Sequence, residues 1–351
     1  MFTQQRWYTI PTVKWWKLLL LICGLLLLIP TGNNCRAGSG GQNMGLQQVE
    51  RPLLAHAAAS STWCDQLGWN PTDFGLKDHS VFLYEGFYYL VSIRTPDEKA
   101  FVYARSADLC SWEDLGAVLG GRTLGEWDEA FVWAPFVMED GGIFYMYYTG
   151  VSRNYTQSIM LAVSSNPADP GSWQRVGMIF QPDHVGMQWQ AQHWADCRDS
   201  SILKVGDIYY MVYTGRNTSG PIIGWAISFS PVGPWHDRGA TLSISQKYEM
   251  AESPTIVSRA GAFYLIYNNT SKGEEYRIGQ TQLGPWSEAF PLPSGWAHEV
   301  WVGHNGVDYT SFLKGYNLVI GRSLWDTSYI PPRLYVMAGT FSLFFPYLIN
   351  P

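Results

Sequence analysis

Short apolar runs with no helical periodicity alternate with turn residues along most of the chain. From about residue 66 the runs are rich in aromatic and β-branched residues and are separated by Gly, Asn and Pro, as in Ser80–Tyr84, Glu85-Gly86 and Phe87–Val91. This pattern is typical of β-strands joined by tight turns. No stretch shows the apolar spacing of an amphipathic helix over a useful length. The pattern therefore predicts an all-β domain.

The runs form a repeat that occurs five times. Each copy has an opening strand, a Gly turn, an aromatic strand, a further strand and a closing Trp. In the weaker fifth copy the strands are expected at His298–Val302, Asp308–Leu313 and Leu318–Ser323. Three or four strands per copy are the content of one blade, so the repeat predicts a five-bladed β-propeller. The closing residues are Trp112, Trp173, Trp235, Trp286 and Trp325.

Three acidic residues, Asp78, Asp199 and Glu252, open copies one, three and four. The closing Trp follows them after 34, 36 and 34 residues, a regularity that loose hydrophobic alternation would not keep. If the opening strand is the innermost strand of each blade, the three carboxyls converge at one mouth of the central channel. A single Asp in a loop is more often a turn or strand-end residue, but three acids in phase within a repeat favour a catalytic site.

Several motifs occur in the order found in five-bladed glycoside hydrolases: Trp133-Ala134-Pro135, Ser106 to Trp112, and Ser230 to Trp235. With the three acids, they make the sequence resemble, over roughly residues 66–330, the clan of family 43 and of families 32 and 68. Family 43 holds arabinanases, arabinofuranosidases and xylosidases, and the other two families act on fructans.

The sequence departs from these families at two positions. His79 follows Asp78 and Ser200 follows Asp199, where the families usually have Pro. Arg198 before Asp199 matches the fructan-acting branch, but the Asn-Asp-Pro-Asn element of that branch is absent. The departures bear mainly on the substrate, and they leave room for a propeller that binds carbohydrate without catalysis.

The resemblance implies a role for each acid. Glu252 would be the general acid, and Asp78 would be the base of an inverting enzyme or the nucleophile of a retaining one. Asp199 would bind sugar hydroxyls and raise the pKa of Glu252 by like-charge proximity. A carboxyl separation of about 5 Å indicates retention, and roughly 6.5–9.5 Å indicates inversion. Because the family 43 motifs outnumber the others, we expect inversion.

Four further residues are expected to bind substrate: Trp133, Arg198, His298 and Asp128. The resemblance implies that His298 faces the channel and helps to hold water or a metal ion, and the alternative is a hydrogen-bonded core His. Asp128 would contact substrate from the rim or lie in a solvated loop. Arg198 would orient Asp199 or form a surface ion pair of little energetic value.

Aromatic residues are abundant, with 17 Trp, 21 Tyr and 16 Phe. Their flat faces suit sugar rings, although propellers and sandwiches are aromatic-rich for other reasons as well. We expect at least one of four loop tryptophans to stack on a sugar. These are Trp127, Trp133, Trp189 and Trp194.

Charge and motif content narrow the chemistry. The net charge is −6 and no basic run is present, which argues against a nucleic-acid partner. We find no Gly-rich phosphate loop, no Ser-centred nucleophile elbow and no Cys or His cluster at metal spacing. We therefore expect no cofactor, although the resemblance leaves room for a structural calcium ion in the channel. The expected partner is an oligo- or polysaccharide, bound by a monomer.

The N-terminus has the pattern of a targeting segment. Lys14 and Lys17 precede the apolar run Leu18–Ile29, which is shorter than the roughly 20 residues of a membrane span. We expect residues 1–37 to be a signal peptide cut after Ala37, with an uncleaved membrane anchor as the alternative. Residues 38–65 are a Gly-, Ala- and Ser-rich linker.

The propeller would then occupy residues 66–351, outside the cytoplasm. The cysteines that remain after cleavage, Cys64, Cys110 and Cys197, permit one disulfide whose pairing the sequence does not fix. The predicted function is that of a secreted glycoside hydrolase cleaving arabinose- or xylose-containing glycans. The alternatives are a fructan-acting hydrolase, a non-catalytic carbohydrate-binding propeller and a protein-interaction propeller.

Overall fold

The computed structural model describes most of the chain beyond the N-terminal segment, and all of the described residues belong to one compact unit, His56–Pro351. The predicted signal peptide and nearly all of the predicted linker lie outside the described residues. Among the described residues, no helix has the length and apolar character needed to cross a membrane. The described ranges are 68–71, 75–121, 124–244, 250–259, 261–292, 295–306, 308–314 and 333–338.

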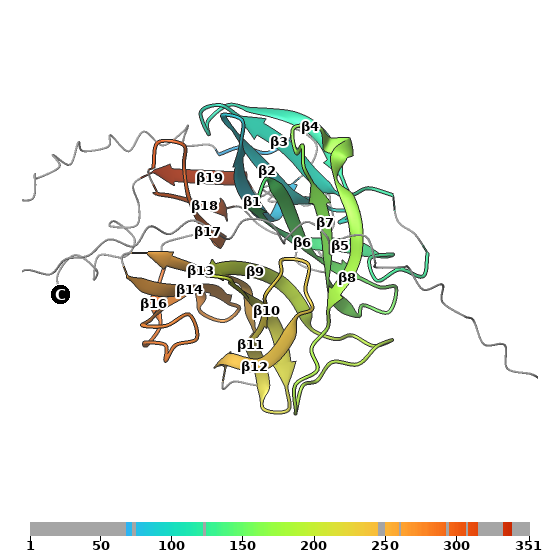
Figure 1. Ribbon diagram of the computed structural model, residues 1–351, viewed down its shortest axis with the longest axis vertical. Coiled ribbons are helices and arrows are strands. Elements are labelled where there is room, and N and C mark those ends of the chain that lie inside the picture. Colours follow the sequence, from blue (N-terminus) through green and yellow to red (C-terminus); the bar gives the residue numbers. More distant parts are fainter. Residues whose placement is uncertain are drawn as a thin grey trace, which may run out of the picture. The chain divides into compact units, whose positions relative to one another are not determined.

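Five antiparallel sheets follow one another along the chain, and in each the strands pair in sequence order (Figure 1). The inner strands of the five sheets contact one another in a ring: β1, β5, β9, β13 and β17. This arrangement confirms the all-β, five-bladed β-propeller and the innermost position of each opening strand.

The strand bounds are as follows: β1 (Gly75–Tyr84), β2 (Phe87–Thr95), β3 (Phe101–Ser106) and β4 (Trp112–Val118) in the first sheet; β5 (Phe131–Asp140), β6 (Ile143–Val151), β7 (Gln157–Ser164) and β8 (Gln174–Phe180) in the second; β9 (Cys197–Val205), β10 (Ile208–Asn217), β11 (Gly220–Ser228) and β12 (His236–Ser243) in the third; β13 (Ala251–Arg259), β14 (Ala262–Asn269), β15 (Gly273–Gly279) and β16 (Phe290–Pro291) in the fourth; β17 (Trp296–Val302), β18 (Asp308–Lys314) and β19 (Arg333–Ala338) in the fifth.

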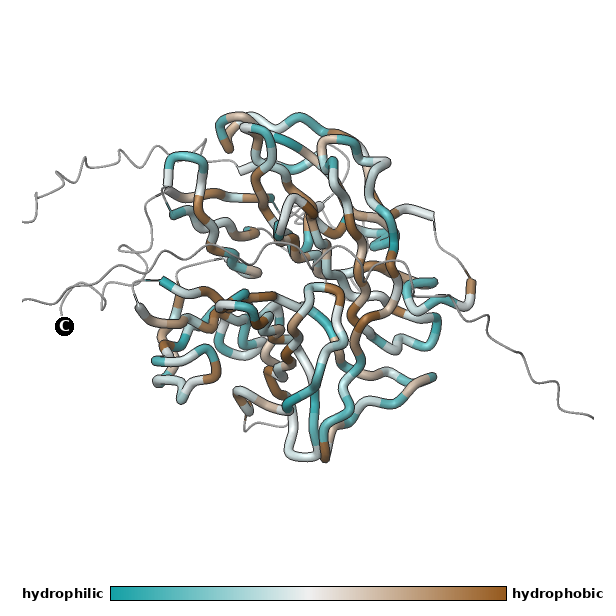
Figure 2. The backbone as a smooth tube through the Cα atoms, in the orientation of Figure 1, coloured by the Kyte–Doolittle hydropathy of each residue, from teal (hydrophilic) through white to brown (hydrophobic). Residues whose placement is uncertain are grey.

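Local sequence explains the hairpins. The β1–β2 connection is Glu85-Gly86, and both residues have positive φ (46° and 84°), the geometry of a two-residue turn that matches strand twist. Gly141-Gly142 connects β5 to β6 in the same way, with φ of 63° and 80°. Figure 2 shows the hydrophobic positions concentrated along the strands and the polar ones in many of the connections.

The core lies between neighbouring blades and is rich in tyrosine. Phe82 and Tyr89 of the first blade pack with Phe144 and Tyr148 of the second. Buried tyrosines need a partner for the hydroxyl, and the next blade supplies it. The hydroxyl of Tyr103 donates to the carbonyl oxygen of Pro167 at 2.6 Å. In the following blade, Tyr147 donates to the carbonyl of Pro231 at 2.7 Å, so the same contact joins successive blades.

The two ends of the domain meet in the fifth sheet. Trp69 and Leu334 exchange two backbone hydrogen bonds, of 2.9 and 2.7 Å, which attach the segment before β1 to β19. The third strand of this sheet is β19, which pairs with β18 and extends the propeller beyond residue 330. The strand expected at Leu318–Ser323 and the closing Trp325 lie outside the described residues.

Candidate active site

Each inner strand carries a bulge with one non-glycine residue in the left-handed region. Its register against the neighbouring strand shifts at this point in all five blades. Such bulges bend a strand and re-aim its side chains, and they are common beside active sites. The bulge residues are Asp78 (φ 40°), Ala134 (41°), Asp199 (58°), Ser253 (48°) and Ala297 (53°).

The bulges show that the three acids do not all occupy the same position in their strands. Asp78 and Asp199 occupy the bulge, whereas Glu252 is one residue before it and Ser253 takes the bulge position. The expectation of three matching positions is therefore wrong for Glu252. The position equivalent to Glu252 holds Lys77 in the first blade, Trp133 in the second and Arg198 in the third. The spacing to the closing Trp does not reveal this offset because the loops differ in length.

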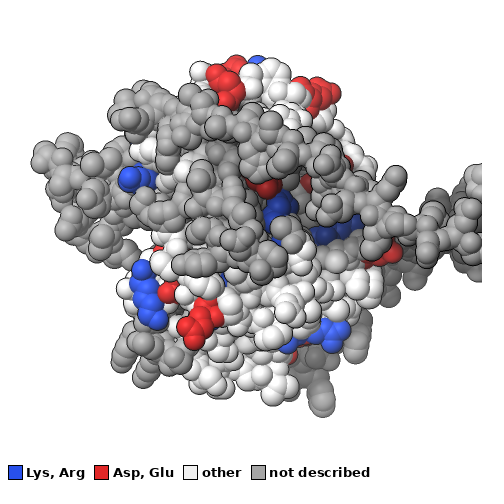
Figure 3. Space-filling view, turned by 90° about the vertical axis from the view of Figure 1, so that its left-hand side faces the viewer, with Lys and Arg blue, Asp and Glu red and all other residues white. Residues whose placement is uncertain are grey.

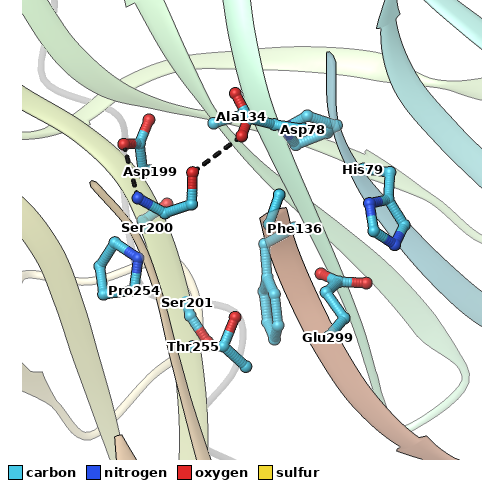
Figure 4. Close-up of a pocket in the computed structure, with 13 residues that line it drawn as sticks. Asp78, His79, Ala134, Phe136, Asp199, Ser200, Ser201, Pro254, Thr255 and Glu299 are labelled. Carbon is cyan, nitrogen blue, oxygen red and sulfur yellow. Dashed lines mark hydrogen bonds between the residues drawn. The ribbon is translucent and has the colours of Figure 1, made fainter. Parts of the chain in front are cut away.

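Asp78 and Asp199 line one cavity where the inner strands meet (Figure 4). Ser253 lines the same cavity. The Ser253 hydroxyl donates to Oδ1 of Asp78 at 2.8 Å, and its backbone N–H donates to Oδ2 of Asp199 at 3.0 Å. Thr214 Oγ1 donates to the same Asp199 oxygen at 3.1 Å. Ser253 is not among the site residues predicted from the sequence, although it immediately follows Glu252.

Arg198 links Glu252 to this pair. Its Nη2 donates to Glu252 Oε1 at 2.8 Å, and its Nε lies 3.5 Å from Asp199 Oδ2. Its Nη1 donates to Asp196 Oδ1 at 2.6 Å and to Gln157 Oε1 at 3.1 Å. Arg198 is buried, so it is no surface ion pair, and it orients both carboxylates, as one of the two expectations had it. Glu252 is the more open end of the network, with 34% of its side chain exposed.

Burial shifts the pKa values of the two bulge carboxyls upward. Desolvation, followed by the charge of Asp199, raises the pKa of Asp78 to about 7, against the opposing effects of Lys77 and Ser253. Burial also raises the pKa of Asp199, with the Arg198 guanidinium acting against it. Because the two carboxyls interact, they titrate as a pair rather than singly.

Two neutral groups line the same cavity. His79 Nε2 lies 2.7 Å from Ser311 Oγ, and burial, helped by His298, lowers the pKa of His79 to about 3. Burial raises the pKa of Glu299 to about 8, although its carboxylate accepts a 3.0 Å bond from the Val81 backbone N–H. Neither His79 nor Glu299 is among the site residues predicted from the sequence, although they stand in the openings of copies one and five.

We expect Glu299→Gln to raise Tm progressively as pH rises, with little gain at pH 5 and a gain of several degrees at pH 8.5. Above about 4.5 the unfolded chain loses the Glu299 proton, whereas the folded protein keeps it to about 8. The stability contributed by the protonated carboxyl is thus lost between these pH values, at about 1.4 kcal/mol per unit. Because the glutamine side chain does not titrate, the Glu299→Gln variant does not lose this stability as pH rises.

Thermal unfolding at both pH values measures this effect, with the exposed Glu288→Gln as the matched control. An equal gain at pH 5 and pH 8.5 would contradict the titration and indicate better packing instead.

Two of the predicted substrate-binding residues lie away from the cavity. Asp128 is only 2% exposed, and its Oδ2 accepts from Tyr148 at 2.9 Å and from Arg175 at 3.0 Å. Both the rim position and the solvated loop expected for Asp128 are therefore wrong, because these two partners hold its carboxylate in the interior.

His298 is not among the residues that line this cavity, and it is only 1% exposed. Its ring stacks on Phe312 at 5.1 Å, and its Nδ1 lies 3.2 Å from Glu274 Oε1. Over the described ranges, no three His, Cys, Asp or Glu side chains converge as metal ligands.

Trp133 stands beside the acids. Its Nε1 donates to Glu98 Oε2 at 2.6 Å, and Lys77 Nζ lies 5.5 Å from its ring centroid and 3.1 Å from Glu98 Oε1. Lys77 adjoins Asp78 in β1, so this group borders the cavity. On the face shown in Figure 3, described basic side chains lie near acidic ones rather than in a patch of one sign.

Comparisons with known proteins agree with this architecture. A sequence profile of the Glycosyl hydrolases family 43 matches residues 70–307. The chain is 26% identical over 251 residues to the probable arabinan endo-1,5-alpha-L-arabinosidase C of Aspergillus flavus, a match that covers 66% of this chain and 73% of that protein. It is 28% identical over 211 residues to the probable arabinan endo-1,5-alpha-L-arabinosidase A of the same species, covering 55% and 60% of the two chains.

Solved structures share the fold. A thermostable family-43 glycoside hydrolase superposes with a TM-score of 0.59 at 19% identity, covering 79% of this chain and 92% of that one. A family 117 glycoside hydrolase from the marine bacterium Zobellia galactanivorans gives a TM-score of 0.61 at 13% identity, with coverages of 79% and 89%. At these identities the likeness shows the five-bladed architecture alone.

Proposed function

The chain belongs to family 43 of the glycosyl hydrolases and is a glycosidase, and from this premise we propose that it hydrolyses arabinose- or xylose-containing polysaccharides, with arabinan first among them. The sequence relatives named as arabinan endo-1,5-alpha-L-arabinosidases support this order. The observation that carries the proposal is the continuous network from Asp78 through Ser253, Asp199 and Arg198 to Glu252. It joins Asp78 and Asp199, which line one cavity, to the more open carboxyl of Glu252.

In the proposed mechanism one carboxyl is the general acid and a second is the general base. Glu252, the more open one, protonates the leaving oxygen, and Asp78 in the cavity takes a proton from the attacking water. Asp199, held by Thr214 and the Ser253 backbone, accepts from sugar hydroxyls. Asp78 and Glu252 are bound by different groups, Ser253 and Arg198, rather than by each other. We propose inversion because the family 43 motifs outnumber those of the fructan-acting families.

A substrate panel tests the proposal. We expect the purified protein to release reducing sugar from linear arabinan, and NMR spectra taken during the first turnovers to show the inverted anomer. Xylan and levan serve as comparison polymers. Hydrolysis of levan alone, or of none of the polymers, would contradict the proposed substrate, and first release of the retained anomer would contradict inversion.

We also propose that the propeller acts outside the cytoplasm, with residues 1–37 as a signal peptide and 38–65 as a linker. The basic residues before the apolar run Leu18–Ile29 support export. Cys110 is disulfide-bonded, and disulfides persist in oxidising compartments. Cys197 is free and buried. Sequencing of the exported protein should find Gly38 first, and an intact Met1 would contradict cleavage.

A further inference from the structure

A row of four aromatic rings runs outward from the candidate active site. Trp133, beside Lys77 and Glu98, stacks on Phe131 with centroids 6.0 Å apart. Phe131 contacts Tyr155 at 5.8 Å, and Tyr155 stacks on Trp194 at 5.5 Å with 20° between the ring planes. Exposure increases along the row, because the two inner rings are partly buried whereas Tyr155 is 43% and Trp194 62% exposed.

Trp194 is held in place despite its exposure. Its indole Nε1 donates to Asp196 Oδ1 at 3.2 Å. Asp196 is buried and is fixed in turn by Arg198 at 2.6 Å and by Arg216 at 3.2 Å. Arg198 is the residue that binds Glu252. Trp194, at the outer end of the row, is therefore held through Asp196 by Arg198, which also orients Glu252. Because the Trp194 ring is already fixed in an exposed position, binding a ligand there costs little additional side-chain entropy.

Planar polar side chains border the same rings. The guanidinium of Arg153 forms two 2.7 Å bonds with Glu129, and the Asn154 side-chain amide donates to Gln192 Oε1 at 3.2 Å. Arg153 and Asn154 precede Tyr155, and Gln192 lies two residues before Trp194. Trp194 stacks on Tyr155 through one face, and its 62% exposure leaves the rest of the ring open to solvent. An exposed ring with amide and guanidinium groups nearby matches a sugar chain, whose C–H faces stack on rings and whose hydroxyls form hydrogen bonds.

The other two loop tryptophans are not available in this way. Trp127 and Trp189 lie against each other, with centroids 6.1 Å apart, and both pack onto the hydrophobic core. Trp133 packs onto the same core cluster as Trp127, so of the four loop tryptophans Trp194 is the exposed one, at 62%.

We propose that the row Trp133–Phe131–Tyr155–Trp194 is an extended binding site for a polysaccharide, engaging sugar residues remote from the bond that is cleaved. The inference deepens the proposed function and rests on it for the position of the cleaved bond. The occupant is a neutral glycan chain, since the row is continuous with the active site through Trp133 and is anchored to it through Asp196 and Arg198. Binding energy gained there favours long substrates over short ones.

Two substitutions at Trp194 test the site, because they separate the ring from its hydrogen bond. Trp194→Ala removes both, and we expect it to weaken retardation in native gels containing linear arabinan by about tenfold in affinity. Trp194→Phe keeps the ring, and we expect it to retain most of the affinity. The control is Phe229→Ala, an exposed aromatic that follows β11 at the end of the third blade away from Arg198.

Kinetics give a second readout. We expect Trp194→Ala to raise KM for linear arabinan by about tenfold while KM for a nitrophenyl arabinofuranoside changes much less. Migration of Trp194→Ala equal to that of the wild type in gels with arabinan, xylan and levan would overturn the site. An equal loss on polymer and small glycoside would also overturn it, by assigning Trp194 to the support of Arg198.

Failure of the extended site can be distinguished from failure of the proposed function. Retardation that depends on Trp194 without hydrolysis of any polymer would keep the extended site and refute the catalytic proposal. Hydrolysis of arabinan without Trp194-dependent retardation would refute the extended site and keep the catalytic proposal.

Discussion

Replacing Asp78 by asparagine is expected to lower kcat on arabinan by about 10²–10⁴-fold, the usual contribution of a positioned general base. The amide keeps the size and can still meet the Ser253 hydroxyl, which lies 2.8 Å from the native carboxylate. What it removes is the ability to take a proton from water. We assign Asp78 as the base because of its environment: burial beside Asp199 raises the pKa of Asp78 to about 7.

The same substitution should stabilise the protein as pH rises. The unfolded chain loses the Asp78 proton near pH 4, whereas the folded protein keeps it to about 7. The stability that comes with the protonated form is therefore lost across this interval, and the asparagine variant does not lose it. We expect the variant to gain Tm at pH 8 relative to the wild type, with little gain at pH 4, so that lost activity accompanies gained stability.

Initial rates at saturating arabinan and thermal unfolding at the two pH values measure both effects. Asp207→Asn is the matched control, because Asp207 is exposed in the β9–β10 turn, away from Asp199. The wild-type kcat/KM should rise with pH through an apparent pKa near 7 that belongs to the Asp78–Asp199 pair. An unchanged kcat in Asp78→Asn would remove Asp78 from the mechanism.

Replacing Glu252 by glutamine is expected to lower kcat on arabinan by about 10²–10⁴-fold but to spare substrates with a good leaving group. An unactivated sugar oxygen departs only when it is protonated, whereas a dinitrophenolate departs without a proton. The network should survive the change, because Arg198 keeps its bonds to Asp196 and Gln157, and the glutamine amide oxygen can still accept from it.

Comparison of arabinan with dinitrophenyl arabinofuranoside measures the effect. Glu85→Gln serves as the control, since Glu85 lies in the β1–β2 turn at the opposite end of β1 from Asp78. Equal losses on both substrates would show that Glu252 holds structure or substrate rather than donating the proton.

The repeat carries most of the fold information in the sequence. Alternating apolar runs and residues such as Glu85-Gly86 act between neighbours in the chain, so they specify strands and hairpins locally. The even return of the pattern then predicts five blades with acids at the inner strands. The family resemblance, confirmed by the match over residues 70–307, supplies the reaction class.

The positions of the individual site residues depend on contacts between strands and between blades. The sequence places Glu252 in phase with Asp78, but the phase depends on where each strand bulges against its neighbour, and Ser253 is the residue that occupies that position. Asp128 reads as a loop acid, yet Tyr148 and Arg175, 20 and 47 residues away, bury it.

For the chemistry, the sequence by itself determined which carboxyls are candidates and which four loop tryptophans could stack on a sugar. Only the tertiary structure decided that Arg198 ties Glu252 to Trp194 through Asp196, and that Asp78 is buried enough for its pKa to reach about 7. Hydrogen bonds across 54 residues and the loss of solvent around a carboxyl arise from packing, and no local pattern encodes them.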